Sequence, residues 1–171
     1  MAELVHQLTL IAQLEDVMRS ECSLAQGYHV RQIEDRDRLG LADLYFAVYP
    51  RDIVADGAAA HAEMEQTFAG AYGHLDIAAS PVLWHNNVII GSVITVEVAP
   101  WPDTPAGPFV IEVMVHPTHQ RLGLAAYLMQ QAAHNLIVQG KQTMALRVMS
   151  DNIGAQTLYE QLGFHCWSGA G

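Results

Sequence analysis

The sequence predicts one mixed domain of the α/β or α+β class, in which helices flank a central β-sheet. Three observations carry this prediction. Short apolar segments rich in β-branched residues alternate with longer segments of helical periodicity. Turn-forming glycine, proline and asparagine stand between them. The last third of the chain has the order strand, helix, strand, helix, and 171 residues suffice for one domain.

The chain begins with a segment of helical periodicity. Within residues 3–19 the apolar positions follow a helical repeat: Leu4, Leu8, Ile11, Leu14 and Met18. We therefore expect an amphipathic helix with a linker over residues 1–26, and the main domain over residues 27–171. The apolar stripe would pack either on that domain or on a second copy of the chain, so a homodimer is one expectation.

The middle of the chain predicts a strand, two helices and a β-hairpin. The alternating residues 28–34 form the strand, and residues 35–48 and 56–71 form helices on either side of a proline break. Two apolar strands follow, "PVLWHN" and "VIIGSVITVEV", joined at Asn86–Asn87, a pair typical of a tight hairpin. A proline-rich loop then spans residues 99–108.

The C-terminal part predicts two strand–helix units and a final strand. In order these are a strand over residues 109–115, a helix over 122–139, the strand "TMALRVMS", a helix ending at Leu162 and the short strand "GFHCW". Pro117 ends the first strand because it cannot donate to a ladder, and Gly140 ends the first helix. Ser150 or Asp151 would cap the second helix.

Composition argues for a globular domain outside membranes. Apolar residues make up 51% and charged residues 15%, which excludes a disordered chain, and no apolar run reaches the ~18 residues of a membrane span. The N-terminus lacks the features of a signal peptide. Two cysteines, Cys22 and Cys166, are too few for a disulfide framework, so we expect a reducing, cytoplasmic setting. A net charge of −10 argues against nucleic-acid binding.

The charges are unevenly distributed. Residues 113–150 contain no Asp or Glu but do contain Arg121, Lys141 and Arg147, so this segment carries +3 in a chain of −10. Within it, "HPTHQRLGLA" turns from a strand into a helix, whose first amides lack partners and lie at the positive end of the helix dipole. Gly123 would let an anion approach the backbone. We expect an anion site here, suited to phosphate.

Two known motif families do not fit this turn. It lacks the Gly-Lys-Ser/Thr ending of a P-loop and the three spaced glycines of a dinucleotide-binding turn. ATP and NAD are therefore not the expected ligands.

The segments "VMVHPTHQRLGLA" and "LRVMSDNIGAQTLYEQLGF" together resemble the two central motifs of the GNAT superfamily of acyl-CoA-dependent N-acyltransferases. Gln120-Arg121-x-Gly123-x-Ala125 is similar to its Q/R-x-x-G-x-G/A signature. The resemblance covers residues 110–165 and implies a GNAT-type mixed sheet flanked by helices, with acetyl-CoA as co-substrate and no metal. The family usually places two strands after Gly-Phe, whereas seven residues follow Phe164. The last strand would be missing, truncated, or supplied by another segment or subunit.

The resemblance also implies roles for individual residues. The backbone of Val113, Met114 and Val115 would pair with the pantetheine arm, and Asn152 would bind the arm near the thioester. The pyrophosphate would lie on the turn at the start of the helix, on the residues Gln120, Arg121, Leu122, Gly123, Leu124, Ala125 and Ala126. Arg121 and Lys141 would be outer phosphate contacts.

Tyr159 would be the acid that protonates the departing thiolate, or alternatively a core tyrosine. For the base there are two candidates, Glu112 and Glu97. Glu112 lies in an apolar strand on the face shared with Val110 and Met114, where burial would raise its pKa. Its alternative is a structural glutamate, and a water chain could replace either base. His116 could relay protons, or belong to the turn before Pro117.

The expected function is therefore N-acetylation of a primary amine on a small molecule or peptide. The alternative is a catalytically silent acyl-CoA-binding sensor or assembly module. Carboxylates outside the anion segment favour a cationic acceptor: Asp52, Asp56, Glu63, Glu65, Glu97 and Asp103. One branch of the family, the acetylases of ribosomal-protein N-termini, has a glutamate five residues before the asparagine, where this sequence has Arg147. This difference argues against membership of that branch.

Overall fold

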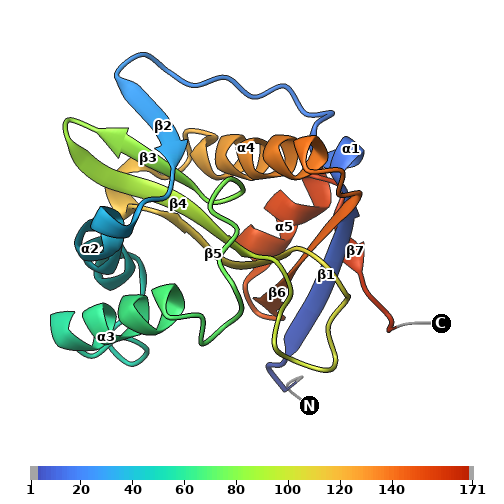
Figure 1. Cartoon of the computed structure of the whole chain (residues 1–171), viewed down its shortest axis with the longest axis horizontal. Helices are drawn as coiled ribbons and strands as arrows, with labels where there is room; N and C mark the ends of the chain where they lie inside the picture. The colour runs from blue at the N-terminus through green and yellow to red at the C-terminus, as the bar shows by residue number, and fades with distance from the viewer. Residues whose placement is uncertain (1–3, 170–171) are drawn as a thin grey trace.

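The protein is a mixed sheet with helices on both faces (Figure 1). The computed structural model describes residues 4–169, and within them the strands run in the order β2-β3-β4-β5-β6-β1-β7. The strands are β1 (Gln7–Gln13), β2 (Tyr28–Gln32), β3 (Pro81–His85), β4 (Val88–Val96), β5 (Phe109–Val115), β6 (Thr143–Met149) and β7 (His165–Cys166). The helices are α1 (Leu14–Val17), α2 (Arg38–Val48), α3 (Gly57–Phe68), α4 (Leu124–Val138) and α5 (Ile153–Gln161), with short 3-10 turns at Asp35–Asp37 and Pro117–His119.

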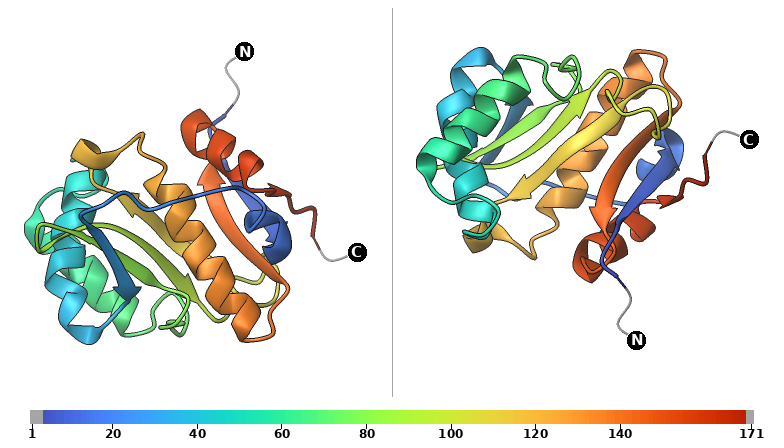
Figure 2. Two further views of the ribbon diagram at one scale, coloured as in Figure 1. Left: turned by 90° about the horizontal axis from the view of Figure 1, so that it is seen from above. Right: turned by 90° about the horizontal axis from the view of Figure 1, so that it is seen from below.

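Two cores lie on opposite faces of the sheet. Helices α1, α4 and α5 cover one face, and α2 and α3 cover the other (Figure 2). Because successive side chains of a strand point to opposite faces, neighbours on β4 enter different cores: Val93 joins the α4 side and Ile94 the α2 side. A mixed, helix-flanked sheet is thus confirmed.

The helix expected over residues 3–19 is wrong, because most of this segment forms strand β1. β1 pairs antiparallel with β6 through seven residue pairs, and α1 adds a single helical turn after it. Leu8, Leu10 and Ala12 also alternate with period two, and all three face the α4 core. The same sequence fits both repeats, and pairing with β6 decides between them. Leu4, part of the expected helical stripe, is 88% exposed.

β1 also supplies the strand that the sequence lacks after Phe164. It lies between β6 and β7, with β7 paired to it at Leu10 and Ile11 (Figure 1). The missing strand therefore comes from another segment of the same chain, one of the three alternatives. The apolar side chains of β1 pack in the core of the same chain, so they no longer argue for a homodimer. The homodimer stays a prediction. The domain boundary near residue 27 also stays a prediction.

Of two further local predictions, the hairpin turn is confirmed and the cap of α5 is wrong. The hairpin turn at Asn86 and Asn87 has φ values of 50° and 61°, as a tight turn with two left-handed residues requires. The cap of α5 is Asn152, whose side chain accepts a hydrogen bond from the amide of Ala155 at 3.1 Å. The expected caps, Ser150 or Asp151, are therefore wrong. Ser150 instead accepts from the amide of His6 at 3.0 Å, because its hydroxyl meets the start of β1.

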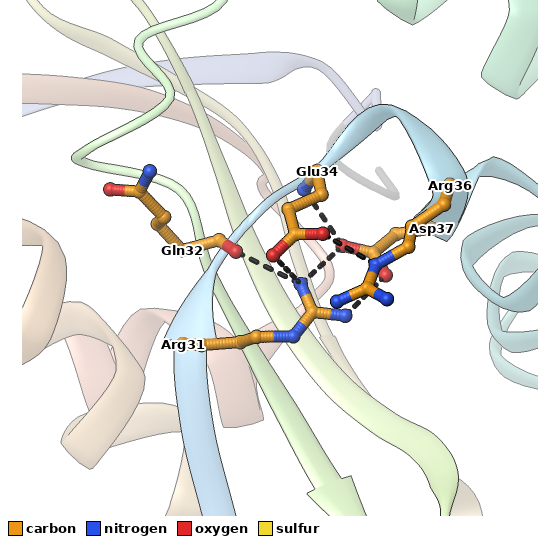
Figure 3. Close-up of polar contacts among 5 residues, drawn as sticks. All are labelled: Arg31, Gln32, Glu34, Arg36 and Asp37. Carbon is orange, nitrogen blue, oxygen red and sulfur yellow. Dashed lines mark hydrogen bonds and ion pairs between the residues drawn. The ribbon is translucent and has the colours of Figure 1, made fainter.

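A partly buried ion pair fixes the turn from β2 into α2 (Figure 3). The guanidinium of Arg31 donates to both carboxylate oxygens of Asp37, at 2.7 and 2.8 Å, and the amide of Glu34 donates to the same carboxylate at 2.8 Å. Asp37 is buried, so these bonds replace the water that its charge loses. The pair therefore sets the start of α2, the helix that leads to Tyr49.

No helix within residues 4–169 has both the length and the apolar character needed to cross a bilayer.

We expect Leu10→Ala to lower the free energy of unfolding by about 2–5 kcal/mol, because the Leu10 side chain is buried between β1 and α4. Leu4→Ala is the matched control, with an expected change within about 0.5 kcal/mol. Urea unfolding of both variants measures the difference. A large loss for Leu4→Ala would instead support an amphipathic helix.

Candidate active site

The site begins where β5 and β6 separate. These parallel strands pair only at Phe109–Ala145 and Val110–Leu146. Beyond that point lies a cavity of about 230 Å³. It is lined by residues of β5, β6, α5 and the end of α2: Tyr49, Val110, Ile111, Glu112, Val113, Leu146, Arg147, Val148, Met149, Asn152, Ala155 and Tyr159. The cavity therefore contains Glu112, Tyr159 and Asn152, three residues singled out from the sequence.

A bulge in β5 determines where Glu112 points. The register with β4 shifts between the pairs Ile94–Glu112 and Thr95–Val110, so Ile111 is the extra residue. Val110 faces the α4 core, whereas Met114 faces the α2 core. The expectation that Glu112 shares a face with both is therefore wrong for Val110. Glu112 lies on the α2 side, where the hydroxyl of Tyr49 donates to its carboxylate at 2.6 Å.

The environment of Glu112 makes its carboxyl group a weak acid. Burial, and to a lesser degree the nearby Glu63, raise its pKa to about 7, although the hydrogen bond from Tyr49 acts in the opposite direction. Tyr49 itself stays protonated, since burial and the Glu112 charge raise the pKa of its hydroxyl well above the usual value. At neutral pH the Glu112 carboxyl is thus able both to accept and to release a proton.

Tyr159 is held as a potential proton donor. It is buried on α5, and its ring packs against Phe164 with the ring centroids 5.6 Å apart. Burial, followed by the charge of Glu112, raises the pKa of its hydroxyl to about 12. The Tyr159 hydroxyl therefore remains protonated near neutral pH, on the wall of the same cavity as Glu112.

The turn before α4 forms a second hollow. Arg121 and Gly123 both have positive φ, 65° and 74°, and Gly123 occupies the N-cap position of α4. Since glycine has no side chain to cap the helix, the first amides of α4 remain available to a ligand. The hollow of about 280 Å³ is lined by Val115, His119, Gln120, Arg121, Gly123, Leu124, Ala125, Ala126, Gly154 and Leu158.

The backbone of β5 links the two hollows. The amide of His116 donates to Ile90 of β4, so alternate residues along β5 direct their backbone polar groups toward β4. By this alternation Met114 pairs with β4, whereas Val113 and Val115 face the opening. The side chain of Gln120 donates to the carbonyl of Val115 at 3.2 Å, which agrees with that orientation. Of the three predicted backbone contacts, Val113 and Val115 thus face the opening, and the Val115 carbonyl already accepts from Gln120.

Three of the other predicted residues lie elsewhere. Glu97 follows the end of β4, outside the cavity, with its exposed carboxylate 3.4 Å from His74. His116 accepts from the amide of Thr118 and so belongs to the turn, one of its two predicted roles. Lys141 lies beyond the C-terminal end of α4, a helix of 15 residues and so about 22 Å long. It is therefore at the wrong end of α4 to contact a phosphate on Gly123.

The carboxylates that favoured a cationic acceptor do not line the cavity. Asp56 caps α3, Glu65 pairs with Arg38, and Glu97 lies beside His74. Asp103 is bound to Arg147 at 2.7 Å. Two polar residues of the cavity, Tyr49 and Arg147, were not placed there from the sequence, because each acquires its position only through contacts distant in sequence.

A mixed sheet opened between two parallel strands, beside a helix that starts on a glycine turn, defines the acetyltransferase class of fold. The family model described as the acetyltransferase (GNAT) family matches residues 40–164. This is more than half of the chain, and the chain therefore belongs to the GNAT acetyltransferase family.

Solved structures share the fold. A GCN5-related N-acetyltransferase from Sphaerobacter thermophilus matches with a TM-score of 0.70 and 14% identity, over 94% of this chain and 48% of that chain. Aminoglycoside N-acetyltransferase AAC(6')-Iy in complex with CoA matches with a TM-score of 0.63 and 19% identity, over 85% of this chain and 92% of that chain. The chain thus spans about half the length of the Sphaerobacter protein. Comparison with curated proteins gives no match.

The raised pKa of Glu112 has a consequence for stability. Its folded-state value of about 7 exceeds its ordinary value of 4.5, so the folded protein holds this proton more tightly than the unfolded chain. Stability should therefore fall as pH rises through the window from about 4.5 to about 7. We expect Glu112→Gln, which cannot ionise, to raise the melting temperature at pH 8 and to change it little at pH 4.5.

Thermal unfolding of both proteins at the two pH values measures this effect. Glu97→Gln is the control, because its carboxylate is exposed. An equal shift for Glu112→Gln at both pH values would contradict the assignment of a partly buried, ionising carboxyl group.

Proposed function

We propose that the protein transfers an acetyl group from acetyl-CoA directly to a primary amine of a small molecule or peptide. The observation that carries this proposal is the placement of Glu112 and Tyr159 on one cavity, at the opening between β5 and β6. An amine acceptor requires a base to remove its proton and an acid to protonate the leaving sulfur. Near neutral pH the Glu112 carboxylate can accept a proton, and the Tyr159 hydroxyl remains protonated and can donate one.

The residues present fit the co-substrate. The free amides at the start of α4 suit its pyrophosphate, and the outward backbone groups of Val113 and Val115 suit the amides of its pantetheine arm. Asn152 uses its carbonyl oxygen to cap α5, which leaves its amide donors for the arm. Arg121 adds a positive charge beside the turn. Bound acetyl-CoA supplies the acetyl group as an activated thioester.

In the proposed mechanism the cavity brings the amine to the thioester carbon, and Glu112 accepts the proton that the attacking amine loses. Tyr159 donates its hydroxyl proton to the thiolate that leaves. Alignment of two reactants can contribute an effective molarity of ~10⁵–10⁸ M. One acid or base contributes ~10²–10⁴-fold. Binding and alignment by β5 and the α4 turn therefore contribute more to the proposed rate enhancement than the acid or the base.

The two free cysteines, Cys22 and Cys166, accord with action in the reducing cytoplasm, and this location is part of the proposal.

Two measurements test the proposed function. Acetyl-CoA at millimolar concentration should raise the melting temperature, and thiol release should be seen with at least one amine of a broad panel. A thermal shift without thiol release would favour the silent acyl-CoA-binding module, and no thermal shift would contradict acyl-CoA binding itself.

Gly123→Val should weaken acetyl-CoA binding at least tenfold, because its side chain would stand over the amides proposed to hold the pyrophosphate. Gly140→Val is the matched control: both glycines have positive φ, 74° and 81°, and both would place a Cβ in open space. The backbone strain is therefore similar, but Gly140 follows the opposite end of α4. Calorimetric titration with acetyl-CoA compares them, and equal affinities would contradict the proposed pyrophosphate site.

Tyr159→Phe should lower kcat by ~10²–10⁴-fold while the affinity for acetyl-CoA changes less than threefold, because only the proton donor is lost. Tyr127→Phe, on α4 and outside the cavity wall, is the control. Steady-state kinetics with a reactive amine and titration with acetyl-CoA provide both values. A wild-type kcat for Tyr159→Phe would remove this residue from the mechanism.

A further inference from the structure

Arg147 is the basic side chain among the described residues that line the cavity. It lies on β6 one residue after the last pair with β5, and it is only 18% exposed. Ala145, two residues earlier, faces the α2 core, so Arg147 points to the same side. Glu112 lies on that side too, across the opening between the strands. The base and the guanidinium therefore border the acceptor side of one cavity.

Arg147 is held in place by the proline-rich loop of residues 99–108. Its guanidinium carbon lies 5.0 Å from the centre of the Trp101 ring, and one of its terminal nitrogens donates to Asp103 at 2.7 Å. Trp101 is in turn packed edge-on against Phe109, with ring centroids 5.7 Å apart. The side chain is thus pre-oriented before any ligand binds, which lowers the entropy cost of recognition.

The contact with Asp103 leaves most of the guanidinium donors free. Arginine carries five N–H donors in a planar fork, and the structure gives one bond from this fork to Asp103. Asp103 is 77% exposed, so its ion pair is weakened by water and salt. A second carboxylate can therefore bind the remaining donors, for which the fork geometry is well suited.

A co-substrate phosphate is not the partner of Arg147. The turn that suits phosphate lies at the start of α4 and borders a different hollow, in which Arg121 supplies the basic side chain. Arg147 instead shares its cavity with the proposed base and acid. An anionic group that reaches Arg147 must therefore belong to the acceptor.

We propose that Arg147 binds a carboxylate of the acceptor, so that the protein acetylates small amines that carry a carboxylate, as amino acids do. This inference rests on the proposed function. It narrows the cationic acceptor that the acidic composition favoured, because a polycation would place positive charge beside Arg147. Glu112 receives the proton of the amino group, while Arg147 fixes the other end of the same molecule.

The test compares the common amino acids with their carboxamides as acceptors of the wild-type protein, by thiol release with acetyl-CoA. We expect at least a tenfold higher kcat/KM for the acid of the preferred pair. The amino group of the amide is less basic and so more often neutral, which biases the comparison against this result. A preference for the amide, or for amines without a carboxylate, would overturn the inference and leave the proposed function intact.

Arg147→Gln should raise KM for the preferred amino acid about 10–100-fold, since a hydrogen bond to a charged group contributes about 1.5–3 kcal/mol. It should leave the KM of the amide and the affinity for acetyl-CoA within threefold. Arg147→Lys keeps the charge without the fork and should fall between. Arg36→Gln, an exposed arginine of the β2–α2 turn, is the control for loss of charge. An equal rise in KM for acid and amide would overturn the inference.

If no amine is acetylated, calorimetry with the protein saturated with CoA separates the two proposals. Binding of an amino acid but not of its amide would support the carboxylate site while removing the transferase function. Binding of neither would overturn both.

Discussion

The separation of β5 and β6 after two residue pairs is the constraint on which the rest of the site depends. Backbone groups that leave a ladder must find other partners, and here they border a cavity instead of a neighbouring strand. The bulge at Ile111 adds to this, because it turns Glu112 toward the α2 side. Alternation of the residues that follow then leaves Val113 and Val115 facing the opening. The early end of β5–β6 pairing thus creates the proposed binding edge, and the bulge against β4 sets the position of the proposed base.

An open edge of this kind requires that β6 be held from its other side. β1 does so through seven residue pairs, and its side chains Leu8, Leu10 and Ala12 join the core beneath α4. β7 then pairs with β1 and brings the C-terminal segment to the same part of the sheet. The first strand in the sequence therefore stabilises the strand that carries Arg147. The site and the N-terminal segment are coupled through β6, although they are far apart along the chain.

The basic residues of segment 113–150, which contains no Asp or Glu, lie in different parts of the molecule. Arg121 lies beside the turn at the start of α4, and Lys141 follows its opposite end. Arg147 lies on the cavity wall, against Trp101 and Asp103. The three basic residues that give this segment its charge of +3 therefore lie in three different parts of the fold. Only the tertiary structure distinguishes their surroundings. The acidic residues likewise have different roles: Asp56 caps α3, whereas Asp37, Glu65 and Asp103 pair with arginines.

The sequence alone determined the elements whose signals are local. Backbone preferences of a few residues predict the Asn86–Asn87 hairpin, the strand before Pro117 and the glycine turn into α4. The two motifs of residues 110–165 identify the family. Residues 7–13 fit both a helix and a strand, and only pairing with β6 decided between them. Only the tertiary structure decided the raised pKa of Glu112 and the hydrogen bond that Tyr49, 63 residues away in sequence, donates to it. The position of Arg147 beside Trp101 was also decided only there. Each depends on burial and on neighbours from distant segments, which periodicity and turn chemistry do not encode.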